Sequence, residues 1–186
     1  MSLTLFTPPA DEPVTLEEAR IHLRVTYTEQ DSVITQLIKT ARQWAEEFTG
    51  RAFLTQTWDW KLERFPEFFD VPRPPLQSVT SIKYIDTNGT EQTLAASEYT
   101  VDSARDPGRI VPAYGKSWPP TRGHINDVTV RFVAGYGASG AVMPAAIVNA
   151  LKLQVEILYD RSDSNYLDAI VGARDALLGL YRVHKF

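Results

Sequence analysis

The chain has 186 residues, is 44% hydrophobic and carries a formal net charge of −4. This length is enough to bury one core, or one core with a subsidiary layer. The lack of cysteine excludes disulfides and thiolate chemistry, and the acidic balance disfavours a general DNA-gripping surface, which needs clustered Lys and Arg. There is no signal-peptide pattern and no apolar run of membrane-spanning length, so we expect a soluble protein that does not associate with membranes.

The first fifty residues predict an arm followed by two helices. Prolines among small and acidic residues make 1–13 an extended arm rather than a packed element. A capping-box spacing at Thr15 predicts a short helix beginning there. Apolar residues then recur at helical spacing over 31–48, which predicts a long amphipathic helix. We expect Thr28 to cap this helix and Gly50 to end it.

Beyond Gly50 the pattern changes to that of β-strands. β-branched and aromatic residues near period two begin at Phe53, and four prolines between Pro66 and Pro75 then predict an edge loop or a crossing connection. The pair Asn88-Gly89 is a strong hairpin signal, because both residues tolerate a positive φ. The strands expected in this region are 53–62, 76–86, 90–94, 99–102, 109–111 and 128–133.

Two further helices are expected near the C-terminus. The first begins after Pro144 with an apolar stripe that reaches Tyr159, and the second covers about 167–181. The glycine-rich segment 135–140 superficially resembles a phosphate cradle, but it lacks the Lys-Ser/Thr pair that follows such a loop, so a flexible joint is the simpler interpretation.

The predicted fold class is therefore α+β. A helical body, made of the N-terminal helix pair and the C-terminal helices, comprises 1–52 and 144–186. An antiparallel β region is inserted at 53–134. Together these segments are expected to form a single domain over 1–186.

No residue cluster predicts a metal or cofactor site. His22, His124 and His184 lie far apart, and none has a second ligand at metal-binding spacing. We expect His22 on the polar side of a short helix, His124 in a loop and His184 in a basic tail. The sequence therefore predicts no metal and no cofactor.

One aromatic and acidic stretch leaves an alternative open. Trp58 and Trp60 share a strand face and could stack on a sugar, with Asp59 or Glu63 as a catalytic carboxylate. The same pattern is typical of a small sheet packed on helices or at a subunit interface, which we regard as the simpler reading. A glycan hydrolase and a carbohydrate- or peptide-binding module thus remain alternative functions.

Seven segments, taken together and in this order, resemble the head-tail connector (adaptor) proteins of long-tailed bacteriophages, prophages and gene transfer agents. The resemblance covers nearly the whole chain and is weakest after Tyr159. No single segment is a catalytic signature, so the weight lies in their number and order. They are EPVTLEEARIHLRV, FTGRAF, LTQTWDW, PRPPLQSVTSIKYID with its NG hairpin, EYTVD, GRIVPAYGKSWP and VTVRFVAGYG.

The resemblance implies a structural virion protein rather than an enzyme. Such subunits form a ring of about twelve copies below the portal protein, extend the DNA channel and offer a platform to a stopper or tail-completion protein. DNA would pass without specific binding, and the free subunit could be a monomer. The location implied is the head-tail junction of the virion, after assembly in the bacterial cytoplasm. By similarity the C-terminal segment docks on the portal, through Tyr181, Arg182, His184, Lys185 and Phe186.

Overall fold

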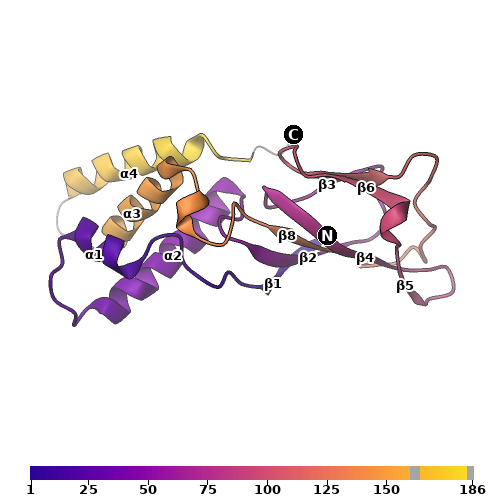
Figure 1. Ribbon diagram of the computed structural model, residues 1–186, viewed down its shortest axis with the longest axis horizontal. Helices are drawn as coiled ribbons and strands as arrows, with labels where there is room; N and C mark the ends of the chain where they lie inside the picture. The colour runs from indigo at the N-terminus through magenta and orange to yellow at the C-terminus, as the bar shows by residue number, and fades with distance from the viewer. Residues whose placement is uncertain (160–163, 184–186) are drawn as a thin grey trace. The chain divides into compact units, whose positions relative to one another are not determined.

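The computed structural model describes residues 1–159 and 164–183. The chain divides into two compact units, each built from two stretches of sequence (Figure 1). The β unit comprises Met1–Pro9 and Thr55–Gly135, and the helical unit comprises Ala10–Leu54 and Tyr136–Phe186. Helices and antiparallel strands both contribute, so the predicted α+β class is confirmed. That the two units act as one domain stays a prediction.

The β unit contains two antiparallel sheets. The larger has five strands in the order β1-β2-β8-β4-β5, and the smaller has three in the order β3-β7-β6. A short 3-10 turn, Ala96–Glu98, precedes β6. The strands are β1 (Ser2–Thr7), β2 (Gln56–Leu62), β3 (Phe69–Asp70), β4 (Leu76–Ile85), β5 (Glu91–Thr93), β6 (Tyr99–Asp102), β7 (Arg109–Pro112) and β8 (Val128–Ala134).

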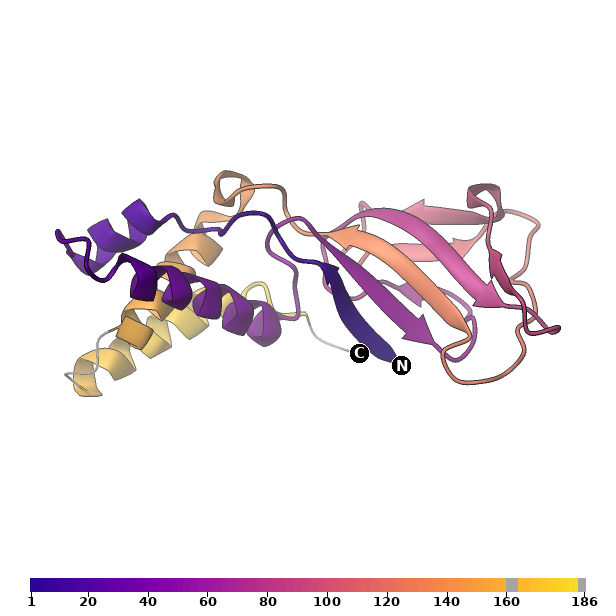
Figure 2. The ribbon, with the colours of Figure 1, turned by 90° about the horizontal axis from the view of Figure 1, so that it is seen from below.

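The N-terminal segment is a strand and not an arm. Ser2–Thr7 pairs antiparallel with β2, as Figure 2 shows for the indigo strand at the sheet edge. The prediction that 1–13 is an unpacked arm, and that it belongs to the helical body, was therefore wrong for these residues. The reason is local: SLTLFT is rich in β-branched and apolar side chains, and the prolines begin only at Pro8, beyond the strand.

Period-two alternation builds the core of the β unit. Trp58 and Trp60 of β2 are 9% and 6% exposed, and Val130 and Phe132 of β8 are fully buried opposite them. Phe69 of β3, also fully buried, meets Trp60 edge-on at 5.7 Å between ring centroids. The apolar face of the larger sheet is thus covered by side chains that include those of the smaller one.

The helical unit consists of four helices in the described residues. They are α1 (Leu16–Leu23), α2 (Asp31–Thr49), α3 (Ala145–Tyr159) and α4 (Ser164–Gly179), and a 3-10 turn, Gly140–Val142, precedes α3. Helix α3 packs against α1, α2 and α4, and its Ile147 and Leu151 are buried with Ile34 and Phe53 in one core. No helix within 1–159 and 164–183 is both long and apolar enough to cross a membrane.

The helix ends match the sequence signals in two cases of three. The capping box at Thr15 is complete, because Glu18 N donates to Thr15 Oγ1 and Thr15 N donates to Glu18 Oε2. Gly50 ends α2 with a φ of 73°, as predicted. The prediction that Thr28 caps α2 with its side chain was wrong. Gln30 is the N-cap, and Thr28 contributes only its carbonyl, which accepts from Asp31 N at 3.1 Å.

The glycine-rich segment packs closely on its surroundings. Tyr136 N donates to Phe53 O at 2.9 Å, and Gly137 forms a β-bridge with Leu54. A Cβ added at Gly140 would overlap the carbonyl oxygen of Pro13. The described backbone of this segment is therefore shaped by close contacts within the helical unit.

Gly140→Ala is expected to lower the free energy of unfolding by about 1–3 kcal/mol, because the backbone at Pro13 must move to admit the methyl group. The measurement is urea denaturation followed by circular dichroism. Gly172→Ala is the matched control, because its added Cβ meets nothing within 4 Å and it lies inside α4. This control is expected to stabilise the fold by up to about 1 kcal/mol. Equal effects of the two substitutions would contradict the close packing at Gly140.

Candidate docking segment at the C-terminus

Residues 181–183, which follow α4, are hydrogen-bonded to the C-terminal end of α2 and the residues just after it. Val183 N donates to Thr49 O at 2.8 Å, and Arg51 Nε donates to Tyr181 O at 2.5 Å. Both acceptors are backbone carbonyls, so the contacts fix the path of the main chain rather than one side-chain conformation. Residues 181–183 thus lie at a defined place in the helical unit, beside the C-terminal end of α2.

Cations and aromatic rings alternate along this part of the unit. The Arg182 guanidinium lies 5.3 Å from the centre of the Phe48 ring, and Phe48 stacks on Trp44 at 5.1 Å. The guanidinium of Arg174, from α4, covers the other ring at 4.0 Å from Trp44. Arg174 is buried and also donates to Gln154 of α3. These contacts hold α4 and the start of the tail against α2.

Two of the five predicted docking residues, Tyr181 and Arg182, lie among the described residues. Tyr181 is half-buried and Arg182 is exposed, so the charged head of Arg182 remains accessible beside the Phe48 ring. His184, Lys185 and Phe186 lie outside the described residues. The assignment of all five to portal docking therefore stays a prediction. Sequence reasoning missed Thr49 and Arg51, because no local pattern relates them to residues some 130 positions away.

The aromatic and acidic residues of β2 that could have formed a glycan-hydrolase site make structural contacts instead. Trp58 and Trp60 are buried in the core of the β unit, so the interpretation of this pair as core residues is confirmed and an exposed stacking platform is not present there. Asp59 points to the other face, where both of its carboxylate oxygens accept from Arg131 at 2.7 Å. The hydrogen bonds from Arg131 hold the pKa of Asp59 below its usual range.

This ion pair makes a pH-dependent contribution to stability. Because the folded-state pKa of Asp59 is depressed, the contribution is present above about pH 4 and is lost as the pH falls through the folded-state value. Asp59→Asn is therefore expected to destabilise the protein at pH 7, and its difference from the wild type should shrink below about pH 4. Urea unfolding at several pH values measures this. Glu63→Gln, which also replaces a carboxylate with an amide but at an exposed position, is the control.

Two of the three histidines lie among the described residues. His22 Nε2 lies 2.8 Å from Glu156 Oε2, on α1 and α3 respectively, and the His124 amide donates to Asp127 at 2.7 Å. Among the described residues no group of three or more His, Cys, Asp or Glu could hold a metal ion. His22 belongs to the helical unit and His124 to the β unit, and His184 lies outside the described residues.

A groove of about 520 Å³ in the helical unit is lined by apolar side chains that include Val14 and Ile38. Two carboxylates at its rim have structural partners. Glu12 accepts from Arg42 at 2.7 Å, and Glu18 closes the capping box of α1 and accepts from Lys152 at 3.1 Å. These carboxylates neutralise basic side chains and cap a helix, so their contacts stabilise the fold.

Residues 13–106, about half of the chain, match the family of phage gp6-like head-tail connector proteins. The chain belongs to this family. It is accordingly a structural connector between head and tail, and the predicted function class is confirmed. The carbohydrate- or peptide-binding module and the glycan hydrolase receive no support from these comparisons.

Solved structures with the same fold come from gene transfer agent (GTA) particles. The chain aligns with a protein in the neck of an empty GTA particle computed with C6 symmetry, at a TM-score of 0.78 and 24% identity. It also aligns with a protein in the neck of a native particle computed with C12 symmetry, at a TM-score of 0.76 and 24% identity. The alignment with a protein in the virion of a native GTA particle has a TM-score of 0.77 and 21% identity. Each alignment covers 100% of this chain and 97% of the other, so the fold is shared over the full length. No curated protein matches the sequence.

Proposed function

We propose that this connector forms a ring of about twelve copies below the portal protein of a phage or gene transfer agent particle. The ring extends the channel through which DNA leaves the head, and its far side receives a stopper or tail-completion protein. The observation that carries the proposal is the family match over 13–106, together with the shared fold over the whole chain with proteins from sixfold and twelvefold symmetric necks.

The charge of the chain suits a channel that DNA traverses. A wall rich in Lys and Arg would bind phosphates and resist movement, whereas a subunit with a net charge of −4 lets DNA slide without specific binding. We further propose that the subunit has no enzymatic activity, that it resides in the virion, and that it joins the particle in the bacterial cytoplasm, with a monomeric form before assembly.

The C-terminal segment is the proposed portal-docking element. It comprises Tyr181, Arg182, His184, Lys185 and Phe186, a mixture of basic and aromatic side chains that fits an acidic, partly apolar surface. Two hydrogen bonds support this role, because they present the segment from a fixed origin: Val183 N donates to Thr49 O, and the Arg51 side chain donates to Tyr181 O. A preorganised origin reduces the conformational entropy that docking must overcome.

Electron microscopy of the purified protein, alone and with its cognate portal, tests the ring. Annular particles with a central hole are expected at least when portal is present, together with a matching solution mass. A protein that stays monomeric and does not bind the portal would refute the connector ring. That result would favour a monomeric binding module with a measurable ligand.

Charge reversal tests the docking segment separately. Arg182→Glu combined with Lys185→Glu is expected to weaken binding to the portal at least about tenfold, because charged groups at a docked contact would be replaced by repulsive ones. Titration of the variant against immobilised portal measures this. Arg64→Glu combined with Arg105→Glu, at exposed positions of the β unit, is the matched control. An equal loss in the control would indicate a general charge effect and contradict docking through the tail.

A further inference from the structure

Among the residues that the structure describes, the five-stranded sheet of the β unit has two free edges. At one edge, β1 pairs with β2 and, in the same described ranges, with no other strand; every residue of β1 except Leu3 is exposed. At the other edge, β5 covers β4 only from Lys83 to Ile85. Within the described residues, the segment Gln77–Ser81 of β4 has no backbone partner on the side away from β8.

Both edges lack the side chains that usually block further pairing. Exposed edge strands normally carry Lys, other charges or Pro, which prevent another strand from adding. Neither Ser2–Thr7 nor Gln77–Ser81 contains a charged residue or a proline. Each contains a register shift, at Leu5/Thr7 and at Val79/Ser81, which limits a new ladder to a few residues. Short edges of this composition are open to pairing.

The two edges also match in side-chain character. Leu5 pairs with Trp58, Trp58 with Phe132, and Phe132 with Val79, so these four residues form one cross-strand row on the same face of the sheet. The ends of the row are incompletely covered, since Leu5 is 40% exposed and Val79 is half-buried. Each edge therefore presents a partly exposed apolar side chain, Leu5 or Val79, on the same face of the sheet.

Strand direction decides how two copies could join. Each neighbouring pair from β1 through β2 and β8 to β4 is antiparallel, so β1 and β4 run in opposite directions. Rotation about a ring axis keeps the direction of each strand relative to that axis. The β1 strand of one copy and the β4 strand of the next therefore meet antiparallel, and this head-to-tail contact joins two different surfaces, as a closed ring requires.

We propose that β1 of one copy adds to the free segment Gln77–Ser81 of β4 in the next copy. The occupant of each edge is thus a second copy of this chain, and the sheets continue from subunit to subunit. Main-chain hydrogen bonds supply the attraction, and the apolar row that ends at Leu5 and Val79 supplies the match. This inference rests on the proposed ring.

Disulfide trapping tests the contact, because the natural chain has no cysteine. Three double variants sample neighbouring registers: Leu5→Cys with Val79→Cys, Thr4→Cys with Ser78→Cys, and Thr4→Cys with Ser81→Cys. Thr4→Cys with Thr87→Cys, which places the second thiol in the β4–β5 hairpin loop, is the control. Each variant is assembled with portal, checked for rings by microscopy, oxidised and run on a denaturing gel.

At least one of the three pairs is expected to give a ladder of covalent multimers up to the ring size, which single-cysteine variants and the control pair do not give. Rings that form normally without such a ladder in any pair would overturn the inference and leave the proposed function standing. A cross-link from Thr4→Cys to the portal would overturn it too, by identifying a different occupant. If wild-type protein with portal gives no rings, the proposed ring fails and this contact fails with it.

A gatekeeper substitution provides a second measurement. Leu5→Lys adds to β1 the charge that natural edges use against pairing, and it is expected to raise the concentration needed for ring assembly at least about tenfold. Thr87→Lys is the control, since it adds the same charge at an exposed position outside both edges. Circular dichroism and the melting temperature verify that both variants fold. Assembly of folded Leu5→Lys at the wild-type concentration would count against the edge contact.

Discussion

Replacing Arg42 with alanine is expected to lower the free energy of unfolding by about 3–5 kcal/mol, because it breaks a buried ion-pair network from one side. Arg42 is 4% exposed, and its guanidinium donates to Glu12 at 2.7 Å and to Glu46 at 2.9 Å. Burial opposes the charge on Arg42, but the two carboxylates outweigh it and raise the pKa of the guanidinium. Without the arginine, the carboxylate of Glu46, which is 6% exposed, remains buried.

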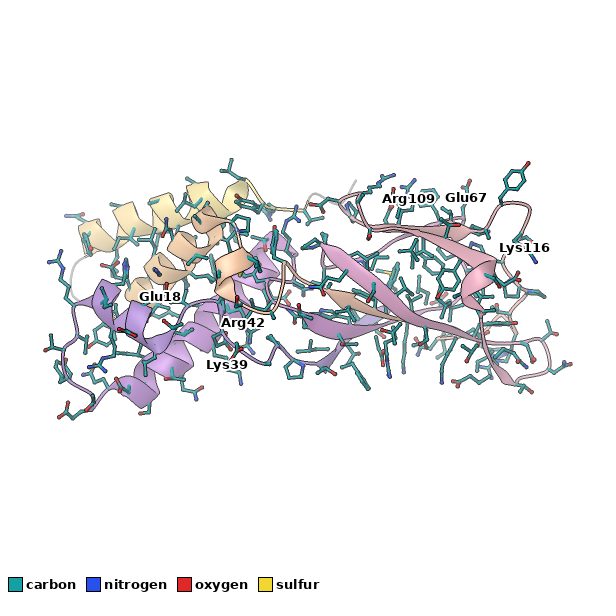
Figure 3. All side chains as sticks on the ribbon, viewed as in Figure 1. Glu18, Lys39, Arg42, Glu67, Arg109 and Lys116 are labelled. Carbon is teal, nitrogen blue, oxygen red and sulfur yellow. The ribbon has the colours of Figure 1, made fainter. Side chains whose placement is uncertain are left out.

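Urea denaturation of the free subunit measures this effect. Lys39→Ala is the matched control, because it removes another cation from α2, at an exposed position labelled with Arg42 in Figure 3. A change within about 0.5 kcal/mol is expected for the control. Arg42→Met combined with Glu46→Gln should recover at least half of the loss, since the amide oxygen can still accept from Phe53 N while position 46, the more buried of the two acidic partners, no longer carries a charge. A loss below about 1 kcal/mol for Arg42→Ala would show that this network does not hold the unit.

The network contacts both ends of the N-terminal stretch of the helical unit. Glu12 lies just after the helical unit begins at Ala10, and Phe53, whose amide donates to Glu46 at 2.8 Å, lies just before that stretch ends at Leu54. Arg42 and Glu46 thus tie both ends of the N-terminal stretch to α2. Charge-assisted hydrogen bonds at these two points add geometric specificity to the path of the chain within the helical unit.

The helices were the most predictable part of the fold. Apolar periodicity over 31–48 and the capping box at Thr15 are local signals, and the structure reproduces both. Ser2–Thr7 was missed because Pro8 and Pro9 outweighed a β-prone hexapeptide, although prolines just beyond a strand do not prevent it. The two-residue strand β3 was missed because it is too short to show any period, and its partner Ile110 is distant in sequence.

The candidate site was less predictable than the fold, because its contacts are nonlocal. The pattern around Asp59 permitted a catalytic carboxylate, and only the register between β2 and β8 shows that the residue faces Arg131. Likewise, the tail was identified by its composition, but its attachment to Thr49 depends on how α4 packs beside α2. The sequence therefore indicated which residue types could serve in catalysis or docking. Only the strand pairing and the helix packing show which of these residues already have partners within the protein.

Phe69→Ala is expected to destabilise the β unit by about 3–5 kcal/mol, because it removes a fully buried ring from between the two sheets. The ring of Phe69 contacts Trp60 of the larger sheet at 5.7 Å and Trp118 at 5.2 Å, both edge-on, with Phe65 at 6.1 Å. Alanine would leave a cavity that these large, mutually packed rings cannot fill without leaving their own preferred positions.

The adjacent Phe68 offers a control of the same residue type. It is 38% exposed and lies under the Arg109 guanidinium at 3.8 Å from the ring centre, so Phe68→Ala should cost only about 0.5–1 kcal/mol. Urea unfolding monitored by tryptophan fluorescence suits this comparison, because Trp60 and Trp118 contact the mutated site. If the two substitutions cost the same, the arrangement that turns Phe69 of β3 inward and Phe68, just before the strand, outward would be wrong. The smaller sheet would then pack differently on the face that carries the row from Leu5 to Val79.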